Sequence, residues 1–147
     1  TVCVPFNMNS TTTNRSVIEN KLVTGYNMFG INPYWNKPEC LYGSGVIMSC
    51  ANDLTKFLTT FISSNDSNIT RMLAPTHVRN NNSSIGLGWI ISNTDNEIIH
   101  WHNGATGGFR SFAAMNKKRK TGIVILSNTQ FKAEDLEKFG FDMLTNE

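Results

Sequence analysis

The sequence is poor in features that identify a metal-binding, nucleic-acid-binding or membrane protein. Its 147 residues include three cysteines and three histidines, with no Cys-x-x-Cys pair and no spacing typical of zinc sites. The net charge is +2, and the basic residues are scattered except in Lys117–Lys120, which we interpret as a turn between two strands. No apolar run approaches the length of a membrane span. We therefore expect one domain with no metal or cofactor, no nucleic-acid partner and no membrane-spanning segment.

The sequence also lacks a complete arrangement for nucleophilic catalysis. No serine is followed by a lysine three positions later, and Gly43-Ser44-Gly45 lacks the spacing of a Gly-x-Ser-x-Gly elbow. Two triads match catalytic motifs in isolation: Lys120-Thr121-Gly122 and Tyr34-Trp35-Asn36. The first closes a basic turn and the second lies in a proline-bounded loop, so we assign neither of them a catalytic role.

Two regions precede the strand-like part of the chain. Residues 1–43 show little periodicity and are expected to form an irregular loop region, whereas residues 44–84 are expected to be helical. Apolar residues at helical spacing predict a helix over about 50–63, and a shorter helix is expected over about 69–73. Ser49 is predicted to cap the longer helix, and Asp53 lies in its first turns, where its charge suits the helix dipole. We assign Asp53 no chemistry.

Residues 85–147 are expected to form strands followed by a C-terminal helix. Four stretches bounded by turn residues predict the strands: Ile85–Ser92, Glu97–His102, Gly108–Asn116 and Gly122–Asn128. A final helix over about 133–145 carries apolar residues that can pack across the strands. The pattern therefore predicts an α+β fold, in which an antiparallel meander of three to four strands is flanked by helices.

The most informative stretch is His102-Asn103-Gly104-Ala105-Thr106-Gly107-Gly108-Phe109, called the glycine-rich segment below. Glycine inside a strand marks a bend or a close approach by a ligand or another backbone. The histidine can transfer a proton near pH 7, and bare backbone N–H groups can stabilise an oxyanion. We interpret the segment as part of an acyl-transfer site. The alternative is a glycine-rich hairpin that carries a surface histidine.

A set of short stretches carries a family resemblance. They are Gly25-Tyr26, Gly45–Ser49, Asn52–Leu54, Lys56-Phe57, Gly86–Trp89, His102–Phe109 and Thr121–Asn128. From about residue 20 to its C-terminus, the chain resembles the C-terminal part of the class C β-lactamase-like serine hydrolases. That family includes β-lactamases, DD-peptidases, D-aminopeptidases and esterases.

The resemblance implies a role for each part of the glycine-rich segment. The third active-site motif of the family, Lys-Thr-Gly or His-x-Gly, corresponds to His102-Asn103-Gly104. His102 and Gly104 are thereby implied as catalytic, with Ala105 as the donor of one oxyanion-hole N–H. Asn103, Thr106 and Gly107 are implied as substrate-binding residues. The implied reaction is attack by a serine on an amide, ester or β-lactam carbonyl, followed by hydrolysis of the acyl-enzyme.

The resemblance covers only part of that family's pattern. Its nucleophile motif, its Tyr-x-Asn motif and its N-terminal strands lie upstream of the stretches that match, so we expect this chain to be a fragment that is inactive without an N-terminal part of the same protein. The alternative is a non-catalytic relative that binds a ligand or serves as a scaffold, and a secreted surface domain is a third option. A periplasmic or secreted location is implied by the resemblance alone.

Overall fold

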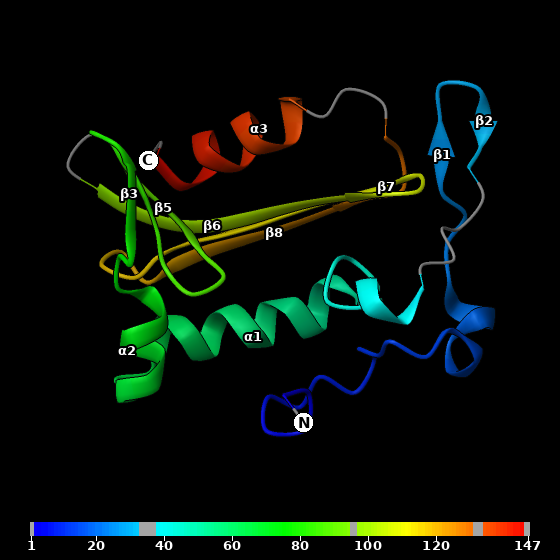
Figure 1. Ribbon diagram of the computed structural model, residues 1–147, viewed down its shortest axis with the longest axis horizontal. Helices are drawn as coiled ribbons and strands as arrows, with labels where there is room; N and C mark the ends of the chain where they lie inside the picture. Colours follow the sequence, from blue (N-terminus) through cyan, green and yellow to red (C-terminus); the bar gives the residue numbers. More distant parts are fainter. Residues whose placement is uncertain (1, 33–37, 95–96, 131–133, 146–147) are drawn as a thin grey trace.

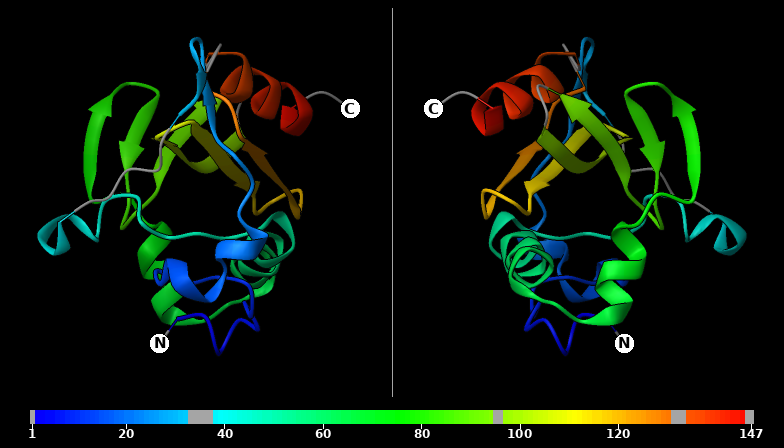
Figure 2. Two further views of the ribbon diagram at one scale, coloured as in Figure 1. Left: turned by 90° about the vertical axis from the view of Figure 1, so that its right-hand side faces the viewer. Right: turned by 90° about the vertical axis from the view of Figure 1, so that its left-hand side faces the viewer.

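A computed structural model describes residues 2–32, 38–94, 97–130 and 134–145 of the chain. Its centre is a six-stranded antiparallel sheet in which each strand pairs with its sequence neighbours, in the order β3-β4-β5-β6-β7-β8. The strands are β3 (His77–Asn80), β4 (Ser83–Ile85), β5 (Ile90–Thr94), β6 (Glu97–Thr106), β7 (Phe109–Asn116) and β8 (Thr121–Ser127). Helices cover both faces of the sheet (Figures 1 and 2). The predicted α+β meander is confirmed, with six strands in place of three or four.

The additional strands have two origins. The strand β3 and most of β4 lie in residues 44–84, which were expected to be helical, and the single strand expected over residues 85–92 is shared between β4 and β5. The expected strand Ile85–Ser92 is divided, because β4 ends at Ile85 and β5 begins at Ile90. Between them Gly88 has a φ of +78°, and the N–H of Gly86 donates to the carbonyl of Trp89 at 2.8 Å. This glycine turn reverses the chain. The strand β3 shows no alternation of buried and exposed residues, so its sequence carried no period-two signal.

One face of the sheet is covered by α1 (Ala51–Ser63) and α2 (Ser67–Leu73). The apolar side of α1 places Leu58 and Phe61 against Trp89 and Met115 in the larger core cluster. The helix begins one residue later than expected: Cys50 is its N-cap and makes no side-chain capping bond. The predicted cap, Ser49, instead shares a hydrogen bond of 2.7 Å with Thr11 through their hydroxyl groups.

The opposite face is covered by α3 (Glu134–Thr145), close to the predicted C-terminal helix. Its Leu144 packs with Ile99, Phe112 and Ala114 in a second core cluster. Gly140 lets the helix approach the sheet closely, because a Cβ at this position would lie 2.3 Å from Cε1 of Phe112. The sheet is therefore the middle layer between two helical layers.

The N-terminal region runs along α1 and then along the end of the sheet. Its described residues form short 3-10 helices at Arg15–Val17, Glu19–Lys21 and Glu39–Leu41, and the small hairpin of β1 (Tyr26–Asn27) and β2 (Gly30–Ile31). The predicted irregular region thus includes a hairpin. Tyr34-Trp35-Asn36 lies outside the described residues. In the described part of the chain, no helix has the length and apolar character needed to cross a bilayer.

Asp53 joins the N-terminal region to α1 and has more partners than a helix dipole provides. Its side chain is 1% exposed. Its carboxylate accepts hydrogen bonds from the N–H of Ser10 at 2.7 Å, the hydroxyl of Thr11 at 2.9 Å and the amine of Lys56 at 3.1 Å. Burial raises the pKa of Asp53, but the bonds from Lys56, Ser10 and Thr11 outweigh it and hold the pKa below its usual value. The carboxylate therefore acts as a structural anchor.

Candidate active site

The glycine-rich segment forms the end of β6, the turn that follows it and the first residue of β7. The strand β5 pairs with β6 only as far as Trp101, whereas β7 continues to pair with it as far as Thr106. Among the described strands, residues 102–106 therefore have a neighbour on one side only. Their outer edge can present main-chain N–H and C=O groups to a ligand.

The side chains of successive residues in β6 point to opposite faces of the sheet, so the predicted site residues are divided between the two faces. His102 lines a hollow on the α1 face together with Ala113, its partner across the ladder. The side chain of Asn103 points the other way and donates from Nδ2 to the carboxylate of Glu137 on α3. Gly104 returns to the face of His102.

His102 is exposed and has one defined hydrogen bond. Its Nδ1 lies 2.7 Å from the carbonyl oxygen of Asn103. Because a carbonyl can only accept, Nδ1 must carry the proton of this bond. In the neutral ring, Nε2 is then left with a free lone pair. This tautomer can accept a proton from a reacting group or, once protonated, hold an anion.

On the α1 face of the strand end, the space beside Gly104 is occupied by a neighbouring hydroxyl group. Gly104 lies directly opposite Ser111 of β7, and a Cβ at position 104 would lie 2.7 Å from the Ser111 hydroxyl oxygen. A side chain here would collide with that hydroxyl. Ala105 is exposed at the next position, Thr106 is half-buried and Gly107 is buried in the turn. The structure thus brings five of the six predicted residues to one strand end, with the sixth, Gly107, in the adjoining turn.

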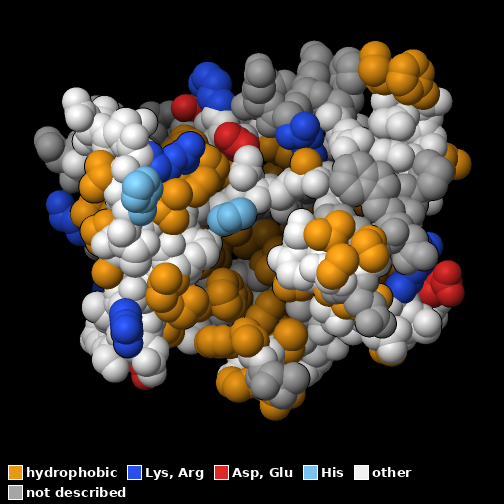
Figure 3. Space-filling model, in the orientation of Figure 1, with side chains coloured by type: hydrophobic (Ala, Val, Ile, Leu, Met, Phe, Trp, Pro, Cys, Tyr) orange, Lys and Arg blue, Asp and Glu red, His pale blue; other side chains and the backbone are white. Residues whose placement is uncertain are grey.

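An apolar hollow of about 280 Å³ borders His102. We define it by its lining residues, which come from α1, α2, the β4–β5 turn and the sheet: Leu54, Phe57, Leu58, Met72, Leu87, Gly88, Trp89, His102 and Ala113. Figure 3 shows hydrophobic side chains gathered in a depression on this face of the molecule. A titratable ring at the rim of an apolar hollow is a common setting for catalysis and for ligand binding.

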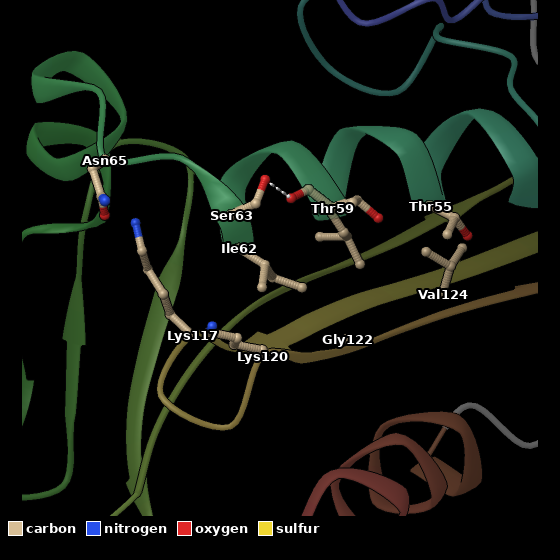
Figure 4. A pocket seen from close by; sticks show the side chains of 10 residues that line it. Thr55, Thr59, Ile62, Ser63, Asn65, Lys117, Lys120, Gly122 and Val124 are labelled. Atoms are coloured by element: carbon tan, nitrogen blue, oxygen red, sulfur yellow. Dashed lines mark hydrogen bonds between the residues drawn. The ribbon is translucent and has the colours of Figure 1, made fainter.

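A second hollow, of about 510 Å³, is not at this site. It lies between α1 and β8, and the side chains of Thr55, Thr59, Lys117 and Lys120 border it (Figure 4). Lys120 and Gly122, the ends of the Lys-Thr-Gly triad, line this hollow and not the one beside His102. The chemistry of the glycine-rich segment makes the smaller hollow the candidate site.

His100 precedes the candidate site on the same strand but has a different environment. It is 8% exposed, and its Nε2 lies 3.0 Å from the carbonyl oxygen of Leu73 at the end of α2. Burial lowers the pKa of this histidine, assisted by the charge of Lys117, while the bond to Leu73 raises it. Net, the pKa lies below its usual value, so the ring stays neutral at physiological pH and joins α2 to the sheet.

Three parts of this site were not predicted from the sequence. They are the hydroxyl of Ser111 beside Gly104, the carboxylate of Glu137 on Asn103, and the apolar hollow. The alternation of β6 and β7 could have indicated Ser111, since it requires only the register of one hairpin. The other two depend on how α1, α2 and α3 pack against the sheet.

The chain matches the Beta-lactamase family over residues 1–146. It is similar in structure to the octameric penicillin-binding protein homologue from Pyrococcus abyssi (19% identity, TM-score 0.79, 97% of this chain and 35% of that chain). It is also similar to a β-lactamase/D-alanine carboxypeptidase from Pseudomonas syringae (17%, 0.81, 95% and 49%). A class C β-lactamase is a further match (15%, 0.83, 99% and 49%). None of the curated proteins gives a significant sequence match.

These structural similarities establish the fold. The chain spans 49% of the length of two of these structures and 35% of the third, so it corresponds to part of each of them.

Proposed function

The chain belongs to the beta-lactamase family, and from this premise we propose that it is the C-terminal part of a serine hydrolase that cleaves an amide, an ester or a β-lactam through an acyl-enzyme. The observation that carries the proposal is the open end of β6. At this strand end, His102 has a free Nε2 and lines an apolar hollow, and the main-chain groups of the following residues face an edge left unpaired by the described strands.

Each residue of the strand end has a proposed role. His102 lines the cleft, where Nε2 transfers a proton or holds a substrate carboxylate. Gly104 leaves room for the Ser111 hydroxyl at the strand end, and the N–H of Ala105 is one of two oxyanion donors. Losing such a donor costs about 2.7–4 kcal/mol of transition-state stabilisation. Asn103, Thr106 and Gly107 bind substrate, Asn103 through its main chain because its side chain is bonded to Glu137.

The nucleophile is proposed to lie in an N-terminal part of the same protein, which would complete the site next to the apolar hollow. Two observations support this. No serine of the chain has a lysine three positions later, and the solved structures that resemble the chain are two to three times its length. We further propose that the whole enzyme acts outside the cytoplasm, in the periplasm or after secretion.

Labelling with a fluorophosphonate tests the proposal directly. The natural protein is labelled, run on a denaturing gel and measured by intact mass, with the 147-residue chain labelled in parallel. We expect the label on residues outside this chain and no labelling or ester turnover by the chain alone. Label on a serine within the 147 residues, or turnover by the chain alone, would contradict the proposed division of the site.

A His102→Ala variant of the natural protein distinguishes the enzyme from a non-catalytic relative. In the enzyme, turnover should fall strongly while the protein stays folded, because His102 is exposed and its one hydrogen bond is local. Lys118→Ala, which removes an exposed side chain in the turn after β7, is the matched control. A natural protein that is neither labelled nor active would favour the binding or scaffold alternative.

A further inference from the structure

The turn at the end of β6 is held by three segments that lie far apart in the sequence. Tyr26 donates its N–H to the carbonyl of Asn128 at 2.8 Å and to that of Gly108 at 3.3 Å. The side-chain Nδ2 of Asn128 donates to the carbonyl of Thr24 at 3.0 Å. Gln130 donates its N–H to the carbonyl of Tyr26 at 2.9 Å. We call Thr24–Tyr26, Gly107–Gly108 and Asn128–Gln130 the three-segment junction.

The backbones of this junction are in direct contact. A Cβ at Gly108 would lie 2.6 Å from the carbonyl carbon of Gly25, and Gly108 has a φ of +78°. A Cβ at Gly25 would lie 3.0 Å from the carbonyl oxygen of Gly107 and 2.7 Å from Cε2 of the Phe109 side chain. In Figure 1, the β1–β2 hairpin lies beside the end of the sheet where β6 turns into β7. The contact leaves no space in which the turn and the hairpin can shift independently.

The end of β6 needs such support more than an ordinary strand does. Residues 102–106 are paired by β7 but not by β5. Gly104, Gly107 and Gly108 add backbone freedom, which costs conformational entropy to order. An oxyanion donor must nevertheless be held within about 0.5 Å of its productive position. The junction supplies, at the turn, the restraint that β5 supplies to the earlier part of β6.

We propose that Asn128 is a positioning residue for the reaction: through the three-segment junction it holds the end of β6, and with it the Ala105 N–H, in the geometry that stabilises the oxyanion. This inference rests on the proposed hydrolase function. Asn128 contributes through its carbonyl to Tyr26 and through its side chain to Thr24. Substituting Asn128 keeps the main-chain bond to Tyr26, whereas alanine or aspartate removes the side-chain bond to Thr24. The side-chain bond can therefore be tested alone.

The effect of losing that bond should fall on the chemical step. An oxyanion donor acts more strongly on the transition state than on bound substrate, so a displaced donor lowers kcat and leaves KM nearly unchanged. A displacement of 1 Å at an active site can cost about a hundredfold in rate. For one hydrogen bond at the edge of the junction, we expect kcat to fall about tenfold and KM to stay within about twofold.

The experiment uses the natural protein that contains this chain, with a p-nitrophenyl ester as substrate. The variants are Asn128→Ala and Asn128→Asp; the aspartate has the same shape but carries a negative charge in place of the amide donor. The control is Asn116→Ala, at the other end of β7, where Nδ2 donates to Glu97 at 2.5 Å and Oδ1 accepts from the N–H of Arg119 at 3.0 Å. Asn116 is fully buried, and the control variant loses two side-chain hydrogen bonds where an Asn128 variant loses one.

A fall in kcat at constant KM in both Asn128 variants, with kcat retained in Asn116→Ala, supports the positioning role. Unchanged kcat in a folded Asn128 variant overturns it, and so does an equal loss in Asn116→Ala. Should Asn128→Ala not fold, the aspartate variant decides. A wild-type protein that neither turns over the ester nor reacts with a fluorophosphonate refutes the hydrolase itself, and the positioning role with it.

Discussion

Gly140 lies within α3 at a position where helix propensity and packing predict opposite effects for alanine. By propensity alone, Gly140→Ala should stabilise the helix by about 1 kcal/mol. The structure predicts the reverse, because the new Cβ would lie 2.3 Å from Cε1 and 2.6 Å from Cδ1 of Phe112. Phe112 is 1% exposed, with its ring centroid 5.9 Å from that of Trp101 and 5.7 Å from that of Phe141. It therefore has no space to move away.

The magnitude follows from the overlap. Ordinary Cβ contacts begin at 3.4 Å, so the overlap exceeds 1 Å. Overpacking costs about 1–3 kcal/mol, and an immobile ring places this case near the upper end. Subtracting about 1 kcal/mol for propensity leaves a net loss of about 2 kcal/mol.

Equilibrium urea denaturation followed by far-UV circular dichroism measures this loss in the free energy of unfolding. Gly43→Ala is the matched control, because no heavy atom lies within 4 Å of a Cβ at that position, and it should change stability by less than about 0.5 kcal/mol. Combining Gly140→Ala with Phe112→Leu should cost less than the sum of the two single changes. A Gly140→Ala protein as stable as the wild type would refute the packing of α3 on β7.

Three further outcomes can be measured on the same protein. Burial holds the pKa of His100 in the folded protein below 6.5, so as the pH falls the unfolded protein binds a proton at this histidine before the folded protein does. The contribution of His100 to the free energy of unfolding is therefore full above about pH 6.5 and falls below it. In His100→Gln, the midpoint of urea unfolding should depend less on pH below about 6.5. Asp53→Ala should free the N-terminal region from α1, seen as faster proteolysis there, whereas Asp66→Ala should not change that rate. Gly108→Ala should destabilise by about 1–3 kcal/mol, since both its φ and the contact with Gly25 exclude a side chain; an unchanged melting temperature would contradict the junction.

Local patterns were enough to predict the longer elements of this fold. Helical spacing of apolar residues placed α1 within one residue of its observed start, because that pattern reflects contacts between residues three or four apart. Strand-like stretches and turn residues likewise located β6, β7 and β8. The hairpin β1–β2 and the strand β3 were missed, and β4 was predicted only through Ile85, because these strands have two to four residues each. The strands β3 and β4 also show no alternation of buried and exposed residues. The division of Ile85–Ser92 depended on the conformation of Gly88.

By itself, the sequence determined where the strands of the site lie and singled out residues 102–109 as a candidate, since a histidine among glycines between two strands is a local pattern. Only the tertiary structure decided which way each residue faces and what it meets. The register of β6 against β5 and β7 opened the strand end, and the packing of α1 formed the apolar hollow beside His102. The packing of α3 directed Asn103 to Glu137. The contacts that α1 and α3 make here join residues more than thirty positions apart, and their geometry depends on the whole core.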